Sequence, residues 1–402
     1  MKSPSFTTPR LLAVASLAAM AALIAVPGTG RSAPLAAVPP VDSQALSEAI
    51  AGLPSSQETA ALVAVGGRSG RWSGSSGLAS LASPTGLASL TSLAKGQPAR
   101  SADEFRVGSI SKVFVATVVL QLVAEHRIGL DEPIQGYLPG LLRADDPPVT
   151  VAELLNHTSG LGPADGSLNT GDPQWFLANR LGTYTTGQLL GQVLQQPLIF
   201  PPGTHQQYNG VNYIVLAMLI RQVTGHSYAQ EIQQRILLPL GLRHTYVPAT
   251  SPVMPAPYLH AYDSVGVASG APLTDISQQS PTLYGAQGAM ISSTADLTRF
   301  ITALFQGRLV PAAQLNDMFT IPSVATGPFR YGMGLLSYTL ANGVTVWGHT
   351  GETPGYASGI FATRDLSRTL AFALTPVEPS DSSQVLTAEL AIAQAAFDPP
   401  AA

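Results

Sequence analysis

The sequence predicts an α/β protein, in which an antiparallel sheet flanked by helices carries an inserted, mostly helical domain. Strand-length apolar runs joined by short turns occur near the start of the chain and again in its last part. Helical patterns separated by Pro/Gly loops fill the middle of the chain. Because short connections favour antiparallel pairing, we expect both ends of the chain to contribute to one sheet.

The composition indicates a globular protein with a large core. Of the 402 residues, 45% are hydrophobic and 11% are charged, which is far from the composition of a disordered chain. The net charge is −4 and the pI is near 6.0, so no basic surface is expected and nucleic acid is not an expected partner. There are no cysteines, which excludes disulfides and thiol chemistry.

The N-terminal residues 1–37 are typical of a secretory signal peptide. Lys2 and Arg10 precede an uncharged apolar run from Leu11 to Val26, and small residues follow it. A retained membrane anchor is the alternative, but the run is shorter than the ~20 residues that usually span a bilayer. No cleavage site is clean, so the mature start is open. We expect a secreted or cell-envelope protein without a stable membrane span once the signal is removed.

The sheet domain is expected to be discontinuous, from residues 42–105 and 288–398. Asp-Ser followed by apolar residues at helical spacing predicts a first helix, and two short apolar runs around two adjacent glycines predict a hairpin. The last part predicts four strands and a closing helix. In chain order, these elements are expected at residues 42–53, 61–77, 331–340, 343–351, 356–365, 368–376 and 382–397. The segment between the hairpin and residue 99 repeats GLASL twice and predicts a surface excursion, not a repeat architecture.

The helical domain is expected over residues 106–287. Its first helix, from Val113 to about Gly129, is apolar on nearly every face until Glu125 and His126, so it must be buried on all sides. Binding sites often lie where two such domains meet.

Lysine is rare in this chain, which makes each retained lysine informative. Of the 20 lysines and arginines, only Lys2, Lys95 and Lys112 are lysines. Arginine cannot be deprotonated in proteins, whereas a desolvated lysine can become a neutral amine. A position that keeps lysine therefore raises the question of whether it needs a base.

Both lysines of the mature chain follow a serine by three positions, at Ser92 and at Ser109. The spacing alone therefore decides nothing. Lys95 is followed by Gly-Gln-Pro, which ends any helix, whereas Ser109 opens the buried helix. There, positions i and i+3 share a face, so the Ser109 hydroxyl and the Lys112 amine can meet.

Burial and the helix dipole would lower the pKa of Lys112 toward that of a useful base, and the dipole favours an alkoxide at Ser109. The alternative is structural: Ser109 is only an N-cap, and the Lys112 side chain reaches out to water. On these residues alone, both interpretations stay open.

Two further residues could complete a site. Tyr208 lies in a Pro/Gly loop just before a helix, although a loop tyrosine is often only a packing residue. His349 ends a strand and is followed by Thr350 and Gly351, where a ligand could lie along the strand edge. A lone histidine is also often structural. No short metal-ligand spacing, P-loop or G-x-S-x-G motif occurs, so a metal site and a cofactor are not expected.

Six motifs in order resemble the serine penicillin-recognising family, which contains D-alanyl-D-alanine carboxypeptidases, class C β-lactamases and related esterases. The resemblance runs from about residue 44 to the end of the chain. The motifs are FRVGSISKVF (S-x-x-K), LLNHTSGL, PPGTHQQYNGVNY (near Y-x-N), LPLGLRHTYV, GAMISSTADLTRF and GHTGETPGY (H-T-G in place of K-T-G).

The resemblance implies a β-lactamase/DD-peptidase-like fold and a serine hydrolase that forms an acyl-enzyme. Ser109 would be the nucleophile and Lys112 its activating partner. Tyr208 would pass the proton to the leaving group, and His349 with Thr350 would position the substrate. The backbone N–H groups of Ser109 and Glu352, which follows Gly351, would form the oxyanion hole.

Two departures from the family pattern affect the expected substrate. The family's Y-x-N reads Tyr208, Asn209, Gly210, so the amide that holds the acyl side is missing from its usual place, and Asn209 or Asn212 would have to replace it. Glu352 stands where peptidases that bind a terminal carboxylate tend to have a hydroxyl residue, and it would repel a carboxylate unless an arginine such as Arg330 offsets its charge.

The expected function is that of a secreted hydrolase related to D-alanyl-D-alanine carboxypeptidases and β-lactamases, with a small-molecule or peptidoglycan-peptide substrate. A carboxylesterase or D-amino-acid amidase on the same fold is the enzyme alternative. A cell-wall-binding module with a degraded site is the non-enzyme alternative. The natural substrate and the oligomeric state are left open by the sequence.

Overall fold

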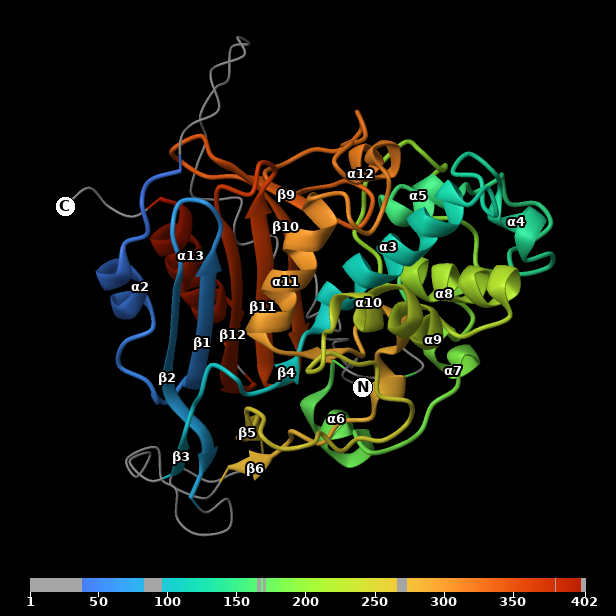
Figure 1. The fold of residues 1–402 in the computed structure, drawn as a ribbon. Helices are drawn as coiled ribbons and strands as arrows, with labels where there is room; N and C mark the ends of the chain where they lie inside the picture. The colour runs from blue at the N-terminus through green and yellow to red at the C-terminus, as the bar shows by residue number, and fades with distance from the viewer. Residues whose placement is uncertain are drawn as a thin grey trace, which may run out of the picture.

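The fold is a mixed α/β structure in which one large sheet stands beside a cluster of helices (Figure 1). The computed structural model describes residues 38–82, 96–164, 168, 171–265, 273–379 and 381–398. The predicted signal peptide, Ser92, Lys95 and the second GLASL copy lie outside these ranges. Among the described residues, no helix is both long enough and apolar enough to cross a bilayer.

Both ends of the chain build the sheet, as the sequence predicted. The main strand order is β3-β2-β1-β12-β11-β10-β9-β8, and β1 pairs antiparallel with β12. The strands of this path are β1 (Glu58–Gly66), β2 (Trp72–Leu81), β3 (Gly96–Pro98), β8 (Arg330–Tyr331), β9 (Leu336–Thr339), β10 (Thr345–Thr353), β11 (Tyr356–Thr363) and β12 (Thr369–Glu378). Four short strands lie off the path: β4 (Phe105–Arg106), β5 (Tyr262–Asp263), β6 (Thr274–Asp275) and β7 (Ile291–Ser292).

Helices cover both faces of the sheet, which explains why its central strands are apolar along their whole length. Every residue of β11 is buried. α11 (Thr294–Phe305) lies on one face, and α13 (Ser382–Phe397) with α2 (Ser43–Ala49) lies on the other (Figure 1). α2 begins one residue after the predicted start, with Asp42 as its N-cap, and ends four residues before the predicted end.

The other helices gather beside the sheet, around α3 (Ser111–Ala124). Eleven of the fourteen residues of α3 are buried, as its all-round apolar sequence predicted. The surrounding helices are α4 (Ile134–Tyr137), α5 (Val151–Leu155), α6 (Pro173–Asn179), α7 (Thr186–Leu190), α8 (Val211–Thr224), α9 (Tyr228–Ile232), α10 (Leu238–Leu240) and α12 (Ala312–Met318). The division into residues 106–287 and the flanking segments stays a prediction.

Two elements differ from the sequence expectation. The first GLASL copy is not part of an excursion but the end of β2, because β3 pairs with it and gives its backbone groups hydrogen-bond partners. The helical pattern after residue 227 is interrupted: α9 continues into a π-type segment, Gln233–Leu237, before α10. A proline at residue 239 falls at the start of α10, where its missing N–H is tolerated.

Candidate active site

Ser109 and Lys112 meet at the start of α3. Ser109 is the middle residue of a 3₁₀ turn, Gly108–Ile110, and α3 begins at Ser111. Gly108 has a φ of +47°, in the left-handed region, which lets the chain turn sharply from β4 into the helix. The Ser109 Oγ and the Lys112 Nζ lie 2.8 Å apart, within hydrogen-bond distance. Lys112 therefore does not extend into water.

The environment of Lys112 favours the neutral amine. Its side chain is 2% exposed, and burial lowers its pKa from 10.5 to about 7. Its Nζ also donates to the main-chain carbonyl of Gln287 over 2.8 Å and lies 5.0 Å from the Tyr208 ring centroid. No carboxylate is among these partners, so none of them supplies the negative charge that would raise the pKa of Lys112 again.

Tyr208 reaches the same hydroxyl from the other side. Its phenol donates to the Ser109 Oγ over 2.7 Å. Burial raises the pKa of Tyr208 above its usual value, and the charge of Glu352 raises it further, so the phenol keeps its proton. The loop is held on both sides of Tyr208, because Gln207 N donates to the His157 carbonyl over 2.9 Å and Asn209 N donates to His157 Nδ1 over 3.2 Å.

His349 lies on β10 beside this group, with its ring 5.8 Å from that of Tyr208. Its Nδ1 donates to the carbonyl of Thr350, and its buried Nε2 has no hydrogen-bond partner in the described part of the chain. Burial lowers the pKa of His349 to about 3, and the neighbouring Lys112 contributes to the shift. The imidazole is therefore neutral at neutral pH.

Two glycines let the turn at Ser109 press against the edge of β10. A Cβ on Gly351 would lie 1.9 Å from the Val107 carbonyl oxygen and 3.0 Å from Ser109 N, and a Cβ on Gly108 would lie 2.5 Å from Glu352 N. This close approach brings the backbone of Ser109 and that of Glu352 together. It is the arrangement that an oxyanion hole made of these two N–H groups requires.

The two asparagines that could replace the missing amide are held away from the nucleophile. Asn209 donates from its side chain to the carbonyls of Leu161 (2.7 Å) and Gly162 (2.8 Å). The Asn212 side chain accepts from Ser159 Oγ over 2.8 Å and is fully buried. The structure brings neither amide to Ser109, so a substrate role for either would need these bonds to break.

Thr350 and Glu352 alternate with His349 and Gly351 along β10, so their side chains leave the strand on its other face. Thr350 lines a small apolar space between the sheet and α13, together with Glu389. Glu352 is exposed, and its charge raises the pKa of both Tyr208 and Glu389. Glu352 therefore lies close enough to influence the site electrostatically.

Sequence reasoning did not identify a group of rings behind Lys112. The His157 ring lies 4.7 Å from that of Tyr208, 5.5 Å from that of Tyr213 and 5.1 Å from that of Tyr331. His157 is buried and has a φ of +64°, a conformation that non-glycine residues rarely adopt. The LLNHTSGL motif contains His157, and that motif was the only signal that could have singled it out.

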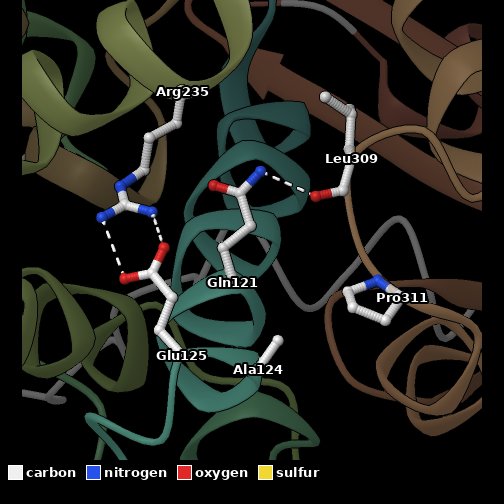
Figure 2. Close-up of a pocket in the computed structure, with 6 residues that line it drawn as sticks. All are labelled: Gln121, Ala124, Glu125, Arg235, Leu309 and Pro311. Atoms are coloured by element: carbon white, nitrogen blue, oxygen red, sulfur yellow. Dashed lines mark hydrogen bonds and ion pairs between the residues drawn. The ribbon is translucent and has the colours of Figure 1, made fainter.

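A surface depression at the far end of α3 is separate from this site. Figure 2 shows it between Gln121, Glu125, Arg235 and Leu309, with a volume of about 350 Å³. Gln121 donates to the Leu309 carbonyl over 2.8 Å, and Arg235 pairs with Glu125. Nine residues of helix separate Gln121 from Lys112, which is about 14 Å at the usual rise per residue. The Gln121 amide nitrogen, Arg235 and Glu125 are paired, the buried Gln121 Oε1 has no hydrogen-bond partner in the described part of the chain, and the lining contains no candidate nucleophile.

Within the ranges that the structure describes, no three His, Cys, Asp or Glu residues are grouped so that they could hold a metal ion. The side chains that meet the Ser109 hydroxyl are the amine of Lys112 and the phenol of Tyr208.

The chain matches a family model and resembles characterised proteins over most of its length. Residues 46–395 match the model described as Beta-lactamase. The putative penicillin-binding protein PbpX of Bacillus subtilis (strain 168) is 32% identical over 232 residues, which is 57% of this chain and 52% of PbpX. Penicillin-binding protein 4* of the same organism is 27% identical over 302 residues, which is 72% of this chain and 64% of that protein. The chain thus spans between half and two thirds of these two relatives.

A solved structure matches more completely. The D-stereospecific amidohydrolase from Streptomyces sp. is 34% identical, with a TM-score of 0.75, and the match covers 90% of this chain and 100% of that one. This match and the family model together cover nearly all of the described fold. The chain belongs to the β-lactamase family, and it has the fold of that amidohydrolase.

Proposed function

We propose that the chain hydrolyses amide bonds formed by the carboxyl group of a D-amino acid, through an acyl-enzyme on Ser109. The observation that carries this proposal is the convergence of Lys112 and Tyr208 on the Ser109 hydroxyl, at 2.8 and 2.7 Å. A nucleophile held between a low-pKa amine and a protonated phenol is equipped for acyl transfer.

Acylation would follow from the protonation states of these groups. The neutral Lys112 accepts the Ser109 proton as Oγ attacks the carbonyl carbon, and the negative charge on the tetrahedral oxygen is held by the N–H groups of Ser109 and Glu352. Tyr208 then gives its proton to the leaving nitrogen as the C–N bond breaks, and it regains a proton from Lys112. The products of this half-reaction are the amine and the Ser109 ester.

Deacylation reverses the roles. A water molecule attacks the ester carbonyl and gives a proton to the neutral Lys112, which returns it, directly or through Tyr208, to Ser109 Oγ as the C–O bond breaks. The acid leaves and the Ser109 hydroxyl is restored. No group outside the described site is needed for the proton balance.

The substrate class follows from the charges around the site. His349 is neutral and the charge of Glu352 reaches the site, so His349 offers a terminal carboxylate no positive charge and Glu352 adds some repulsion. An amide without that carboxylate avoids the repulsion. The similarity to a D-stereospecific amidohydrolase along that protein's full chain supports the same choice.

D-alanyl-D-alanine carboxypeptidase activity is the second candidate. Its support is the similarity to a putative D-alanyl-D-alanine carboxypeptidase of Escherichia coli (strain K12), which is 31% identical over 150 residues, 35% of this chain and 33% of that protein. The substrates of the two candidates differ in a testable way, because only the peptide carries a carboxylate on the leaving side.

The test compares D-phenylalanine amide, L-phenylalanine amide and a D-Ala-D-Ala peptide, with Ser109→Ala as the inactive control. We expect hydrolysis of the D-amide well above that of the L-amide and of the peptide, and its loss in Ser109→Ala. Faster hydrolysis of the peptide would favour the second candidate. Intact-mass spectrometry with benzylpenicillin completes the comparison: a lasting adduct on Ser109 indicates a penicillin-binding peptidase, and one that decays indicates a β-lactamase.

Export is part of the proposal. It rests on the charged, apolar and small-residue segments of residues 1–37. Expression with and without these residues, followed by fractionation and N-terminal sequencing of the secreted form, tests it.

A further inference from the structure

The glycine that replaces the family's asparagine leaves room for the side chain of Gln287 in the position that this side chain adopts. Gly210 has φ −68° and ψ −30°, a conformation open to any residue, so its backbone does not need glycine. A Cβ at this position, however, would lie 1.5 Å from Gln287 Oε1 and 2.7 Å from Gln287 Cδ. The Gln287 carboxamide therefore occupies the space in which a side chain at position 210 would begin.

Gln287 is held next to the reacting groups by its own main chain. Its carbonyl accepts from Lys112 Nζ over 2.8 Å. Three residues later, the main chain of Met290 is held as well. Its N–H donates to Ser111 Oγ over 3.1 Å, and its carbonyl accepts from Val107 N over 3.0 Å. The segment that carries Gln287 is thus bonded to the turn that carries Ser109.

The carboxamide itself is available. Gln287 is partly exposed, and within the described part of the chain its side chain has no hydrogen-bond partner. It offers one acceptor oxygen and two N–H donors. By contrast, the amides of Asn209 and Asn212 are bonded inside the protein.

We propose that Gln287 is a substrate-binding residue, whose carboxamide holds the amide or amino group on the acyl side of the substrate over Gly210. This inference rests on the proposed acyl-enzyme at Ser109 and adds the group that orients the substrate there. Gln287, on a different segment of the chain, supplies the side-chain amide that the family has at position 210. Gly210 leaves room for the Gln287 side chain.

The experiment uses two esters, so that it does not depend on amide hydrolysis. The p-nitrophenyl ester of N-acetyl-D-alanine carries the acyl-side amide, and p-nitrophenyl acetate lacks it. For Gln287→Ala, we expect kcat/KM on the first ester to fall about tenfold more than on the second, as the loss of one hydrogen bond predicts. Gln195→Ala, at an exposed glutamine bonded to the Leu141 carbonyl, is the matched control.

A double variant tests the exchange of positions. Gly210→Asn together with Gln287→Ala returns an amide to position 210 once the colliding side chain is gone, so we expect it to recover most of the selectivity for the N-acetyl ester. The assignment would be overturned if Gln287→Ala lowered kcat/KM equally on the two esters or did not lower it. It would also be overturned if the double variant were no more selective than Gln287→Ala. Thermal melting of every variant separates these outcomes from misfolding. Failure to hydrolyse D-phenylalanine amide would count against the proposed function only.

Discussion

Lys112 lies 2.8 Å from the Ser109 hydroxyl in surroundings that lower its pKa to about 7. The distance and the pKa have one origin, since the buried start of α3 both aligns the two side chains and removes water from the amine. An amine with this pKa is a base at neutral pH and an acid when protonated, which acylation and deacylation both need.

The first prediction concerns pH. Below a pH of about 7 Lys112 is an ammonium ion and cannot accept the Ser109 proton, so kcat/KM should rise with pH through about 7 and then level off. Because the pKa of Tyr208 is raised, the phenol stays protonated across this range and adds no second limb. A profile of kcat/KM from about pH 5 to 9 is the measurement.

The control for this profile is Lys112→Arg, which keeps the positive charge but cannot be deprotonated. Its kcat/KM should fall by about 10²- to 10⁴-fold, the range typical of a lost general base. The limb near pH 7 should vanish as well. A variant that keeps the limb would assign it to another group.

The second prediction concerns the phenol of Tyr208. Tyr208→Phe keeps the ring beside His157 and Tyr331 but removes the 2.7 Å hydrogen bond to Ser109, so kcat should fall by about 10²-fold or more, with little change in melting temperature. The loss should be smaller for a p-nitrophenyl ester, whose leaving group needs no proton. Tyr338→Phe, on β9 and stacked on Phe329, controls for loss of a phenol. An equal loss on ester and amide would argue against the proton-transfer role.

The third prediction concerns the close approach at Gly351. Gly351→Ala forces a methyl group to within 1.9 Å of the Val107 carbonyl, which must push the turn at Ser109 away from β10. Activity should fall at least as far as for a lost oxyanion-hole donor, about 10²-fold, and stability should fall by about 1–3 kcal/mol. Denaturant unfolding and kcat measure the two effects. Gly136→Ala, where a Cβ meets nothing within 4 Å, should change neither.

The parts of the site that the sequence predicted are those made by local geometry. Ser109 and Lys112 are three residues apart at the start of a buried helix, and this spacing in that context brings their side chains together. The strands of the last part and their pairing with β1 followed from apolar runs and short turns. Tyr208 and His349 needed the family resemblance, because their positions depend on how distant segments pack.

The role of Gln287 could not be read from the sequence at all. It lies 175 residues from Lys112 along the chain, and its contact with the amine is made by a main-chain carbonyl, which any residue type provides. The gap at Gly210 was visible in the sequence as a missing amide. Only the packing of the 3₁₀ turn at Gly285–Gln287 against the start of α8 shows what fills it.

The last prediction concerns Glu352 and the choice of substrate. Its exposed carboxylate and the neutral His349 together disfavour a substrate carboxylate, so Glu352→Thr should raise the rate of D-Ala-D-Ala peptide hydrolysis relative to ester hydrolysis. Because Glu352 also raises the pKa of Tyr208, the substitution should leave the phenol easier to deprotonate. The ratio of kcat/KM for the peptide and for p-nitrophenyl acetate is the measurement. Salt screens an exposed charge, so the difference between wild type and variant should shrink as ionic strength rises. Glu48→Thr, at an exposed glutamate on α2, is the matched control. A ratio that Glu352→Thr leaves unchanged would show that this carboxylate does not select the substrate.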